Sequence, residues 1–264
     1  MPSRDAVAQR LRAAGCVFAE DEADLLLASA HDDDDLEVLV AQRAAGRPLE
    51  HVLGWAELCG VRVHVDDGVF VPRRRSELLV REAVRLASAR STTPVVLDLC
   101  CGCGAVGVVV ATFVEGVELH AVEIDAGSAA CARRNLARLG GVVHEGDLYA
   151  ALPASLRRRV DVLVANAPYV PSDEIAFLPP EARDFEPRVA LDGGPEGVDV
   201  QRRIVEGAVE WLSPGGHVLV ETSERQVPLT IAAFEAAGLT PYVVTDDDLA
   251  ACVVVGSAVP VVRP

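Results

Sequence analysis

The spacing of apolar residues predicts short helices over the first sixty positions of the chain. Apolar side chains there recur every three or four residues, as they do on the buried face of a helix. A side chain able to accept a hydrogen bond from the first helical turn precedes each stretch. These expected capping residues are Ser3, Asp21, and Asp34 or Asp35. We expect the third helix to end before Gly46-Arg47-Pro48.

A two-residue alternation of apolar and polar positions follows at 58–71 and predicts a β-hairpin. Asp66-Asp67-Gly68 lies within it and is typical of a hairpin turn. A helical pattern then covers residues 75–89 and ends at the polar stretch Ser91-Thr92-Thr93-Pro94.

Beyond residue 94, short apolar runs alternate with longer amphipathic stretches. The runs expected as buried strands are residues 95–99, 120–124, 160–165 and 217–221. The expected helices are residues 105–114, 127–139, 198–212 and 226–237, and two late apolar segments at 241–244 and 249–255 can complete the sheet. Strands alternating with helices of this length predict an α/β fold, a parallel sheet covered by helices on both faces.

The first of these strands runs into a glycine-bearing turn, Asp98-Leu99-Cys100-Cys101-Gly102-Cys103-Gly104. Glycine lets the backbone bend sharply and approach a ligand without interference from a Cβ atom. Ligands of such sheets bind beyond the carboxyl ends of the strands. The candidate cofactor contacts in this turn are Asp98, Cys100, Gly102 and Gly104.

Two acidic residues further along the chain suit a nucleoside. Glu123 ends the next expected strand, where a carboxylate can accept hydrogen bonds from ribose hydroxyls. Asp147, in Glu145-Gly146-Asp147-Leu148, can accept a hydrogen bond from an adenine amino group. The alternative is that both carboxylates only cap the helices after them.

The nucleoside belongs either to a dinucleotide or to S-adenosyl-L-methionine. Gly102, Gly104 and Gly107 match the G-x-G-x-x-G pattern that places a pyrophosphate at a helix N-terminus. Asp98, however, lies in the strand directly before that turn, and an acid there suits a cationic ligand without phosphate. We therefore predict S-adenosyl-L-methionine as the cofactor.

The cysteines of the same turn do not predict a metal centre. No second Cys or His pair at ligand spacing accompanies them, and structural zinc generally has four ligands. We interpret them as small side chains that fill a tight turn. The acidic run at 32–35 is interpreted as the solvated start of a helix, where negative charge is favoured.

The strand expected at 160–165 ends in Asn166-Ala167-Pro168-Tyr169, which we interpret as the catalytic loop. Asn166 is also a candidate cofactor contact. Pro168 keeps Ala167 extended and can direct its carbonyl outward. The Asn166 side-chain oxygen and the Ala167 carbonyl then offer two acceptors for the N–H bonds of an amide or amine, which fixes the direction of the nitrogen lone pair. Tyr169 adds a flat face for a planar acceptor. Catalysis of this kind rests on orientation and electrostatic fit.

Charge and composition restrict the partners. A net charge of −16 repels phosphate backbones and argues against direct nucleic-acid binding. The longest apolar stretch, residues 106–114, is far shorter than the ~20 residues of a membrane helix. The seven cysteines lack the spacing of a secreted disulfide framework, and no signal peptide is visible. We expect a cytoplasmic protein that does not contact a membrane.

Several motifs, in order, resemble the HemK-type protein-(glutamine-N5) methyltransferases. Gly54-Trp55-Ala56-Glu57 with Val71-Pro72-Arg73 is similar to the hairpin region of that family. Residues 98–104 resemble its cofactor loop, and Asn166 to Tyr169 resemble its Asn-Pro-Pro-Tyr signature. The stretch Glu186-Pro187-Arg188-Val189-Ala190-Leu191-Asp192-Gly193-Gly194, with Gly197 after it, is similar as well. The resemblance covers nearly the whole chain.

The resemblance implies a Rossmann-like class I methyltransferase domain at 75–264 with a seven-stranded, mostly parallel sheet. It implies a helical substrate-recognition domain at 1–57 and a β-hairpin linker at 58–74. The implied reaction methylates the side-chain amide of a glutamine, in the Gly-Gly-Gln loop of a peptide-chain release factor or in a ribosomal protein. Asn166 and the Ala167 carbonyl would bind that amide. The implied cofactor contacts are Asp98, Gly102, Glu123 and Asp147, and the candidate substrate contacts are Arg73, Glu186 and Pro187.

The chain departs from the family pattern at three places. Ala167 stands where the family has Pro, and Cys100 where its cofactor turn has Gly. Arg74-Arg75-Ser76-Glu77 replaces Pro-Glu-Thr-Glu, which reverses charge near the expected active site. Two other functions stay open: N-methylation of a nucleobase or a small amine, and ligand binding without catalysis. Isothermal titration with S-adenosyl-L-methionine tests these hypotheses, because an absence of binding would exclude both glutamine methylation and the other N-methylation.

Overall fold

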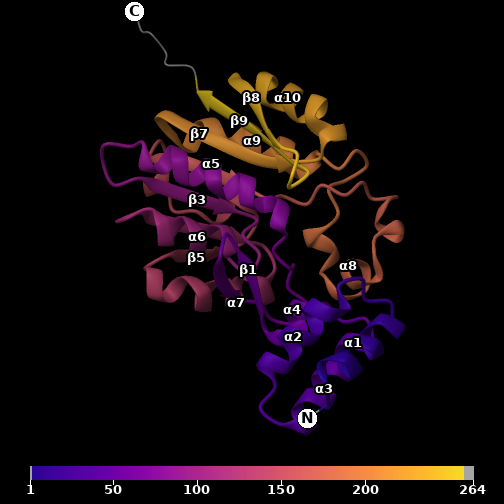
Figure 1. Ribbon diagram of the computed structural model, residues 1–264. Coiled ribbons are helices and arrows are strands. Elements are labelled where there is room, and N and C mark those ends of the chain that lie inside the picture. Colours follow the sequence, from indigo (N-terminus) through magenta and orange to yellow (C-terminus); the bar gives the residue numbers. More distant parts are fainter. Residues whose placement is uncertain (1, 259–264) are drawn as a thin grey trace, which may run out of the picture.

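The computed structural model describes residues 2–258. Figure 1 shows a group of helices at the amino end beside a larger layered domain that is built on one central sheet. The strands of this sheet are β3 (Val95–Leu99), β4 (Glu118–Glu123), β5 (Val142–Glu145), β6 (Val160–Ala165), β7 (Leu212–Thr222), β8 (Leu239–Asp246) and β9 (Ala251–Ala258).

The strand order, β5-β4-β3-β6-β7-β9-β8, places β3 and β6 side by side at the centre of the sheet. Strand β9 is antiparallel to both of its neighbours, and the pairs from β5 to β7 are parallel. Successive connections lead outward in opposite directions from β3 and β6. Such a reversal opens a crevice at the carboxyl ends of the strands, so the fold itself indicates where a ligand binds.

Helices cover both faces of the sheet. Because side chains alternate along a strand, Val96 packs in the cluster that contains α5 (Glu77–Ser88), α6 (Ala105–Phe113) and α7 (Ala126–Leu136). Leu97 packs in the cluster that contains α9 (Asp199–Trp211) and α10 (Val227–Ala236). The shorter helical segments are α8 (Pro180–Phe185), η1 (Arg74–Ser76), η2 (Ala137–Leu139), η3 (Leu148–Ala151), η4 (Ala154–Leu156), η5 (Ile175–Phe177), η6 (Arg188–Ala190) and η7 (Glu224–Gln226).

The predicted strands at 95–99 and 160–165 are confirmed at both ends. Strand β7 begins five residues earlier than the prediction of 217–221, because it includes Ser213-Pro214-Gly215-Gly216. That sequence is typical of a loop, but its pairing with β6 contains a register shift. An irregularity of this kind accommodates Pro and Gly within a strand.

The amino-terminal helices are α1 (Arg4–Ala13), α2 (Ala19–Ser29), α3 (Asp33–Ala44) and α4 (Leu49–Leu53), and they enclose a small core of their own. The predicted cap at Ser3 is confirmed, since its Oγ accepts a hydrogen bond from Ala6 N. The cap predicted at Asp21 is wrong, because α2 already begins at Ala19. Asp32 caps α3 instead of Asp34 or Asp35. It is the residue of the acidic run with extended backbone, and its Oδ1 accepts from Asp35 N at 2.8 Å.

The predicted hairpin has its turn at a different place. Strands β1 (Trp55–Leu58) and β2 (Val61–His64) are joined at Cys59-Gly60, where both residues have positive φ. Two left-handed residues suit the twist of a tight hairpin, but Cys-Gly is not a typical turn sequence. Asp66-Asp67-Gly68 does form a turn, in which Val69 N donates to Asp66 O at 3.3 Å, but this turn follows β2. The prediction that it joins the two strands of the hairpin is therefore wrong.

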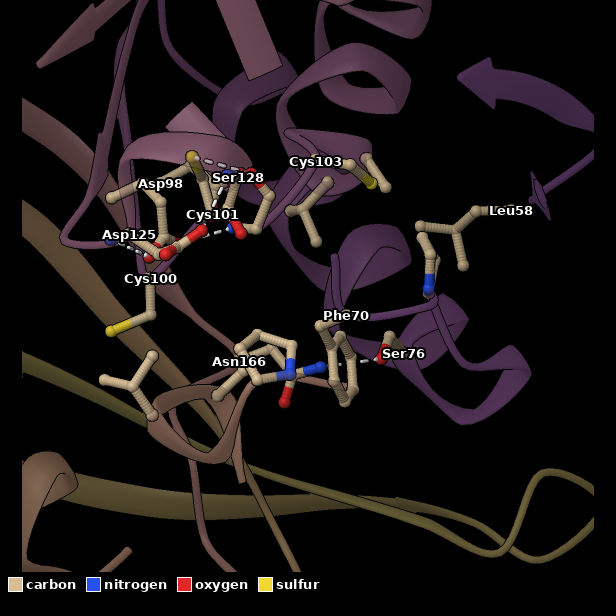
Figure 2. Close-up of a pocket in the computed structure, with 18 residues that line it drawn as sticks. Leu58, Phe70, Ser76, Asp98, Cys100, Cys101, Cys103, Asp125, Ser128 and Asn166 are labelled. Carbon is tan, nitrogen blue, oxygen red and sulfur yellow. Dashed lines mark hydrogen bonds between the residues drawn. The ribbon is translucent and has the colours of Figure 1, made fainter. Parts of the chain in front are cut away.

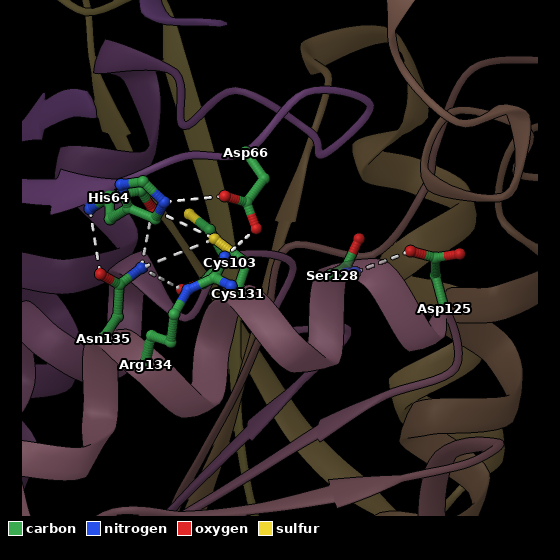
Figure 3. A network of polar contacts seen from close by, with 8 residues as sticks. All are labelled: His64, Asp66, Cys103, Asp125, Ser128, Cys131, Arg134 and Asn135. Carbon is green, nitrogen blue, oxygen red and sulfur yellow. Dashed lines mark hydrogen bonds and ion pairs between the residues drawn. The ribbon is translucent and has the colours of Figure 1, made fainter. Parts of the chain in front are cut away.

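Asn135 of α7 ties the hairpin to the cofactor turn (Figure 3). Its Oδ1 accepts from His64 N at 3.0 Å, and its Nδ2 donates to His64 O at 2.8 Å, as a paired strand would. The same Nδ2 donates to Cys103 O at 2.8 Å. One side chain thus joins the hairpin, α7 and the turn after β3.

A buried arginine connects the amino-terminal helices to the large domain. Arg43 of α3 is 5% exposed, and its Nε lies 2.6 Å from Glu22 of α2. Its Nη1 lies 2.6 Å from Glu181 of α8, an element that Figure 1 shows next to these helices. No helix within residues 2–258 combines the length and the apolar character needed to cross a membrane.

Candidate active site

The turn after β3 is shaped by three residues in the left-handed region. Cys100, Gly102 and Gly104 have φ of 58°, 56° and 80°. Gly104 also approaches α7 closely, since a Cβ there would lie 3.3 Å from Ala132 Cβ. Cys100 thus occupies a conformation that favours glycine, which is the position where the sequence departs from the family pattern.

Asp98 lies beneath this turn and is 1% exposed. Its Oδ2 accepts a hydrogen bond from Gly107 N in the first turns of α6 at 3.1 Å. Burial raises the pKa of the Asp98 carboxyl to about 7, although the hydrogen bond from Gly107 opposes the shift. No ion pair involves Asp98 among the residues described.

Glu123 holds the turn from the neighbouring strand. Its Oε2 accepts from Gly102 N at 2.8 Å, and its Oε1 accepts from Ile124 N at 2.9 Å and from Asp125 N at 3.0 Å. Burial raises the pKa of its carboxyl and these hydrogen bonds oppose the shift. The cap of α7 is Asp125, whose Oδ1 accepts from Ser128 N at 2.8 Å. Glu123 therefore fixes the cofactor turn rather than capping a helix.

These groups line one cavity at the carboxyl edge of β3 and β4 (Figure 2). Its volume is about 650 Å³ with its opening to solvent. Three carboxylates line it, those of Asp98, Glu123 and Asp125, and no Arg or His does within residues 2–258. This set of groups suits a cationic ligand with hydroxyl donors and disfavours a pyrophosphate, so the residues fit S-adenosyl-L-methionine.

Asp147 lines a second cavity that continues from the first past Cys100 and Glu123. Its carboxylate forms an ion pair with Arg203 of α9, with Nη2 at 2.7 Å from Oδ2. Gly104 lines neither cavity. Burial, and next the charge of Glu123, raises the pKa of the Cys100 thiol, which lines both cavities. That thiol stays protonated and is a poor competitor for an electrophilic methyl group.

The loop Asn166-Ala167-Pro168-Tyr169 leaves β6 and rests on the glycines of residues 193–197. A Cβ on Gly193 would lie 2.7 Å from Pro168 O, and one on Gly197 would overlap Tyr169 O. Tyr169 O also accepts a hydrogen bond from Gln226 Nε2 at 2.8 Å. The glycines of this downstream stretch therefore admit the backbone of the loop.

Asn166 presents its amide in one orientation. Its Nδ2 donates to Ser76 Oγ at 3.1 Å, the contact drawn as a dashed line in Figure 2. Within residues 2–258, no donor reaches Asn166 Oδ1 or the Ala167 carbonyl oxygen. Neither of the two acceptors expected from the sequence is thus occupied by a protein donor among the described residues, and Ala167 itself is 1% exposed.

Asn166 and Phe70 line the cavity that contains Asp98 and Glu123, which we call the cofactor cavity. They also line a neighbouring one, which we call the acceptor cavity. The acceptor cavity has a volume of about 820 Å³ with its opening, and Arg75 and Tyr169 lie on its wall. The Arg75 guanidinium lies 5.3 Å from the Tyr169 ring centroid, a cation–π arrangement. Burial raises the pKa of the Tyr169 hydroxyl to about 12.

The three candidate substrate contacts lie in different surroundings. Arg73 lines the acceptor cavity, and Pro187 lines the cofactor cavity. Glu186 is 6% exposed, and its Oε1 accepts from Arg73 Nη2 at 2.5 Å and from Val71 N at 3.2 Å. These contacts are internal, and they hold the segment after the hairpin against the wall of the cofactor cavity.

Some residues of the site lie outside the sequence expectations. Ser76, Phe70 and Asp125 line the cofactor cavity. Asp125 could have been found from its position before a helical pattern. Ser76 belongs to the segment 74–77 that the resemblance places near the active site. Its contact with Asn166 could not be expected from the sequence, because it joins residues ninety positions apart.

The comparisons with known proteins agree with this geometry. Residues 60–177 match the family model described as Methyltransferase small domain. A methyltransferase structure from Pyrococcus furiosus superposes with a TM-score of 0.54 at 14% identity, covering 84% of this chain and 97% of that one. The likeness at this identity concerns the fold. The fold and the cavity define a class I methyltransferase that uses S-adenosyl-L-methionine.

Proteins with similar sequences identify the family within this class of methyltransferases. A release factor glutamine methyltransferase of Geobacter sulfurreducens is 39% identical over 202 residues, which are 76% of this chain and 69% of that protein. One from Mycolicibacterium smegmatis is 35% identical over 262 residues, 93% of this chain and 92% of that protein. The chain belongs to the family of the release factor glutamine methyltransferases.

A relative with a different named substrate lies within the same range of identity. The 4-amino-L-phenylalanine/4-methylamino-L-phenylalanine methyltransferase of Streptomyces pristinaespiralis is 34% identical over 203 residues, 75% of this chain and 69% of that protein. Both named substrates, like an amide, present a nitrogen for methylation.

Proposed function

We propose that this protein transfers a methyl group from S-adenosyl-L-methionine to the side-chain amide nitrogen of a glutamine in a peptide-chain release factor. The observation that carries the proposal is the position of Asn166, which lies on the wall shared by the cofactor and acceptor cavities. A direct transfer needs the donor and acceptor in adjoining spaces with one polar group between them. The names of most relatives support the same reaction.

The cofactor contacts are part of the proposal. Asp98, Gly102 and Glu123 would hold the cofactor in the first cavity, with Asp147 in the continuing one. The bound cofactor supplies an electrophilic methyl group on a sulfonium. Asn166 Oδ1 and the Ala167 carbonyl oxygen accept hydrogen bonds from the two N–H groups of the glutamine amide. These contacts direct the lone pair of the amide nitrogen towards the methyl group. Methyl transfer would exchange the S–CH₃ bond for an N–CH₃ bond, and the nitrogen would release one proton to solvent.

We assign recognition of the protein substrate to residues 1–57, with residues 58–74 as linker. Arg43 supports this assignment, because it connects the amino-terminal helices to Glu181 on the wall of the acceptor cavity. A release factor or ribosomal protein that inserts a glutamine there would contact both parts. A cytoplasmic location without membrane or direct nucleic-acid binding accords with such a partner.

The test is methylation of a recombinant release factor, with the modified residue located by mass spectrometry. We expect one added methyl group on the Gln of the Gly-Gly-Gln loop. Asn166→Ala is expected to lower kcat at least a hundredfold, since amide orientation is lost, and to leave the Kd for the cofactor within about threefold. Label on another molecule, or unchanged turnover in Asn166→Ala, contradicts the proposal.

A second candidate is N-methylation of a small aromatic amine. The relative from Streptomyces pristinaespiralis favours it, as does Tyr169 on the wall of an acceptor cavity that also contains Arg73 and Arg75, which could bind a carboxylate. Incubation with 4-amino-L-phenylalanine separates the two. Methylation of this amine with a kcat/KM above that of the release factor would favour the second candidate.

A further inference from the structure

A buried glutamine holds the loop of residues 166–169, which we call the acceptor loop. Gln226 ends η7 and is 3% exposed. Its Nε2 donates to Tyr169 O at 2.8 Å and to Glu196 O at 3.0 Å. Gln226 lines neither the cofactor cavity nor the acceptor cavity. Its amide therefore contacts the acceptor loop from a position outside the space where the reaction would take place.

The partners of Gln226 fix the direction in which its amide lies. A carbonyl oxygen only accepts hydrogen bonds, so the oxygens of Tyr169 and Glu196 both need the NH₂ end of the amide, which has two protons to donate. The opposite end is matched as well, because Ser223 Oγ donates to Gln226 Oε1 at 2.6 Å. In a flipped amide, Oε1 would face two carbonyl oxygens and repel both. The hydrogen bonds thus select one of two orientations that have nearly the same shape.

The Gln226 amide also joins two segments of backbone. Tyr169 ends the acceptor loop, and Glu196 precedes Gly197, at which a Cβ would overlap both Gln226 Nε2 and Tyr169 O. The next residue of the chain, Val170, is bound to the same downstream stretch, since its N–H donates to Leu191 O at 3.0 Å. Without the amide, two carbonyl oxygens would lose a donor that burial makes costly to replace. Gln226 therefore fixes the end of the acceptor loop against residues 191–197.

We propose that Gln226, oriented by Ser223, is a positioning residue that sets the acceptor loop for methyl transfer. The inference rests on the proposed function, in which residues 166–169 orient the acceptor nitrogen. A fixed carbonyl at Tyr169 fixes the peptide plane that follows it, and this restrains the backbone that carries the Tyr169 ring on the wall of the acceptor cavity. A displacement of about 1 Å in an active site can lower a rate about a hundredfold. Loss of the Gln226 amide should therefore affect turnover more than cofactor binding.

The first test needs no substrate and follows the tyrosines by ¹⁹F NMR. The chain has three, Tyr149, Tyr169 and Tyr242, so labelling with 3-fluorotyrosine gives three signals that Tyr→Phe substitutions assign. Gln226→Met keeps the length of the side chain and removes the amide, and we expect it to shift or broaden the Tyr169 signal. A Tyr169 signal that is unchanged in Gln226→Met overturns the proposal. If the signal changes but no release factor is methylated, only the proposed function fails.

Turnover provides the second test. Gln226→Met is expected to lower kcat about tenfold or more and to leave the Kd for S-adenosyl-L-methionine within about threefold. Ser223→Ala removes the donor to Gln226 Oε1 and should lower kcat by a smaller factor. Ser223→Thr keeps a hydroxyl and should retain most of the activity. A kcat that stays at the wild-type value in Gln226→Met contradicts the proposal.

The matched control is Gln201→Met, which removes another buried amide. Gln201 Nε2 donates to a backbone carbonyl, Glu221 O, at 3.3 Å, and its Oε1 accepts from Thr230 Oγ1 at 2.8 Å. Neither contact involves the acceptor loop, so this variant should lose stability and keep kcat within about threefold per folded molecule. Equal losses of kcat in Gln201→Met and Gln226→Met would mean that Gln226 acts only through stability, and the proposal would be wrong.

Discussion

Asp98 creates a conflict between stability and cofactor binding that can be measured. Its carboxyl is 1% exposed and its pKa is about 7, against 3.8 for the unperturbed group. Between these two values the folded protein keeps a proton that the unfolded chain has lost. Stability therefore falls as pH rises from about 4 to 7 and is constant above that range as far as this group is concerned.

Asp98→Asn removes the charge and leaves an amide oxygen that can still accept from Gly107 N. At 1.36 kcal/mol per pH unit, the substitution should raise the free energy of unfolding by about 1.5 kcal/mol at pH 5 and by up to about 4 kcal/mol at pH 8. The difference between the gain in stability at pH 8 and the gain at pH 5 is the better test. The variant should gain about 2–3 kcal/mol more at pH 8 than at pH 5, because other titrating groups cancel between variant and wild type.

Cofactor affinity should depend on pH in the opposite sense to stability. A cationic ligand beside Asp98 favours the ionised carboxyl, so wild-type affinity should increase from pH 6 to pH 8. Asp98→Asn should bind at least tenfold more weakly at pH 8 and show little dependence on pH. Calorimetric titration with S-adenosyl-L-methionine measures both quantities.

Urea unfolding without ligand at pH 5 and pH 8 provides the stability measurement. Asp161→Asn is the control, since this carboxylate is 5% exposed but has a cation, with Arg90 Nη2 at 2.6 Å. Breaking a buried pair destabilises, so the control should lose stability at both pH values. An equal effect of Asp98→Asn at pH 5 and pH 8, or a loss of stability at pH 8 like that of Asp161→Asn, would contradict a raised pKa of Asp98.

Three further changes test other parts of the structure. Cys100→Gly relieves a left-handed φ, and a gain of about 1 kcal/mol in urea unfolding is expected without weaker cofactor binding; a loss would show that the thiol matters more than the backbone. Gly197→Ala should lower kcat more than tenfold at unchanged cofactor Kd, because its Cβ overlaps Tyr169 O; normal turnover would exclude close packing there. Arg43→Met leaves Glu22 unpaired and should destabilise by about 3 kcal/mol, and a neutral effect in urea unfolding would contradict a buried pair.

Local signals explain which elements could be predicted from sequence. Strands β3 and β6 are uninterrupted apolar runs bounded by polar residues, and the structure gives them the predicted bounds. The turn of the hairpin was misplaced because Cys59 adopts positive φ without being a typical turn residue. The cap of α3 was misplaced within a run of four acids, where the sequence offers several equivalent candidates.

The residues of the site also fall into those that could be predicted from sequence and those that could not. Asp98 lies near the end of β3, Glu123 ends β4 and Asn166 directly follows β6. The carboxyl ends of these strands meet, so the convergence of the three residues on one cavity could be expected. The contact of Ser76 with Asn166 could not, because it joins residues ninety positions apart. The internal contacts of Glu186 with Val71 and Arg73 are equally non-local.

The glycines that admit the acceptor loop have a consequence for protein engineering. Residues 166–169 derive their shape from Gly193, Gly197 and Gln226, which touch the carbonyls of that loop from elsewhere in the chain. Grafting the four residues alone onto another scaffold would leave those carbonyls unsupported. The smallest transferable unit is the loop together with the 191–197 segment and a donor in the place of Gln226. In a directed-evolution library, these positions should be varied jointly rather than one at a time.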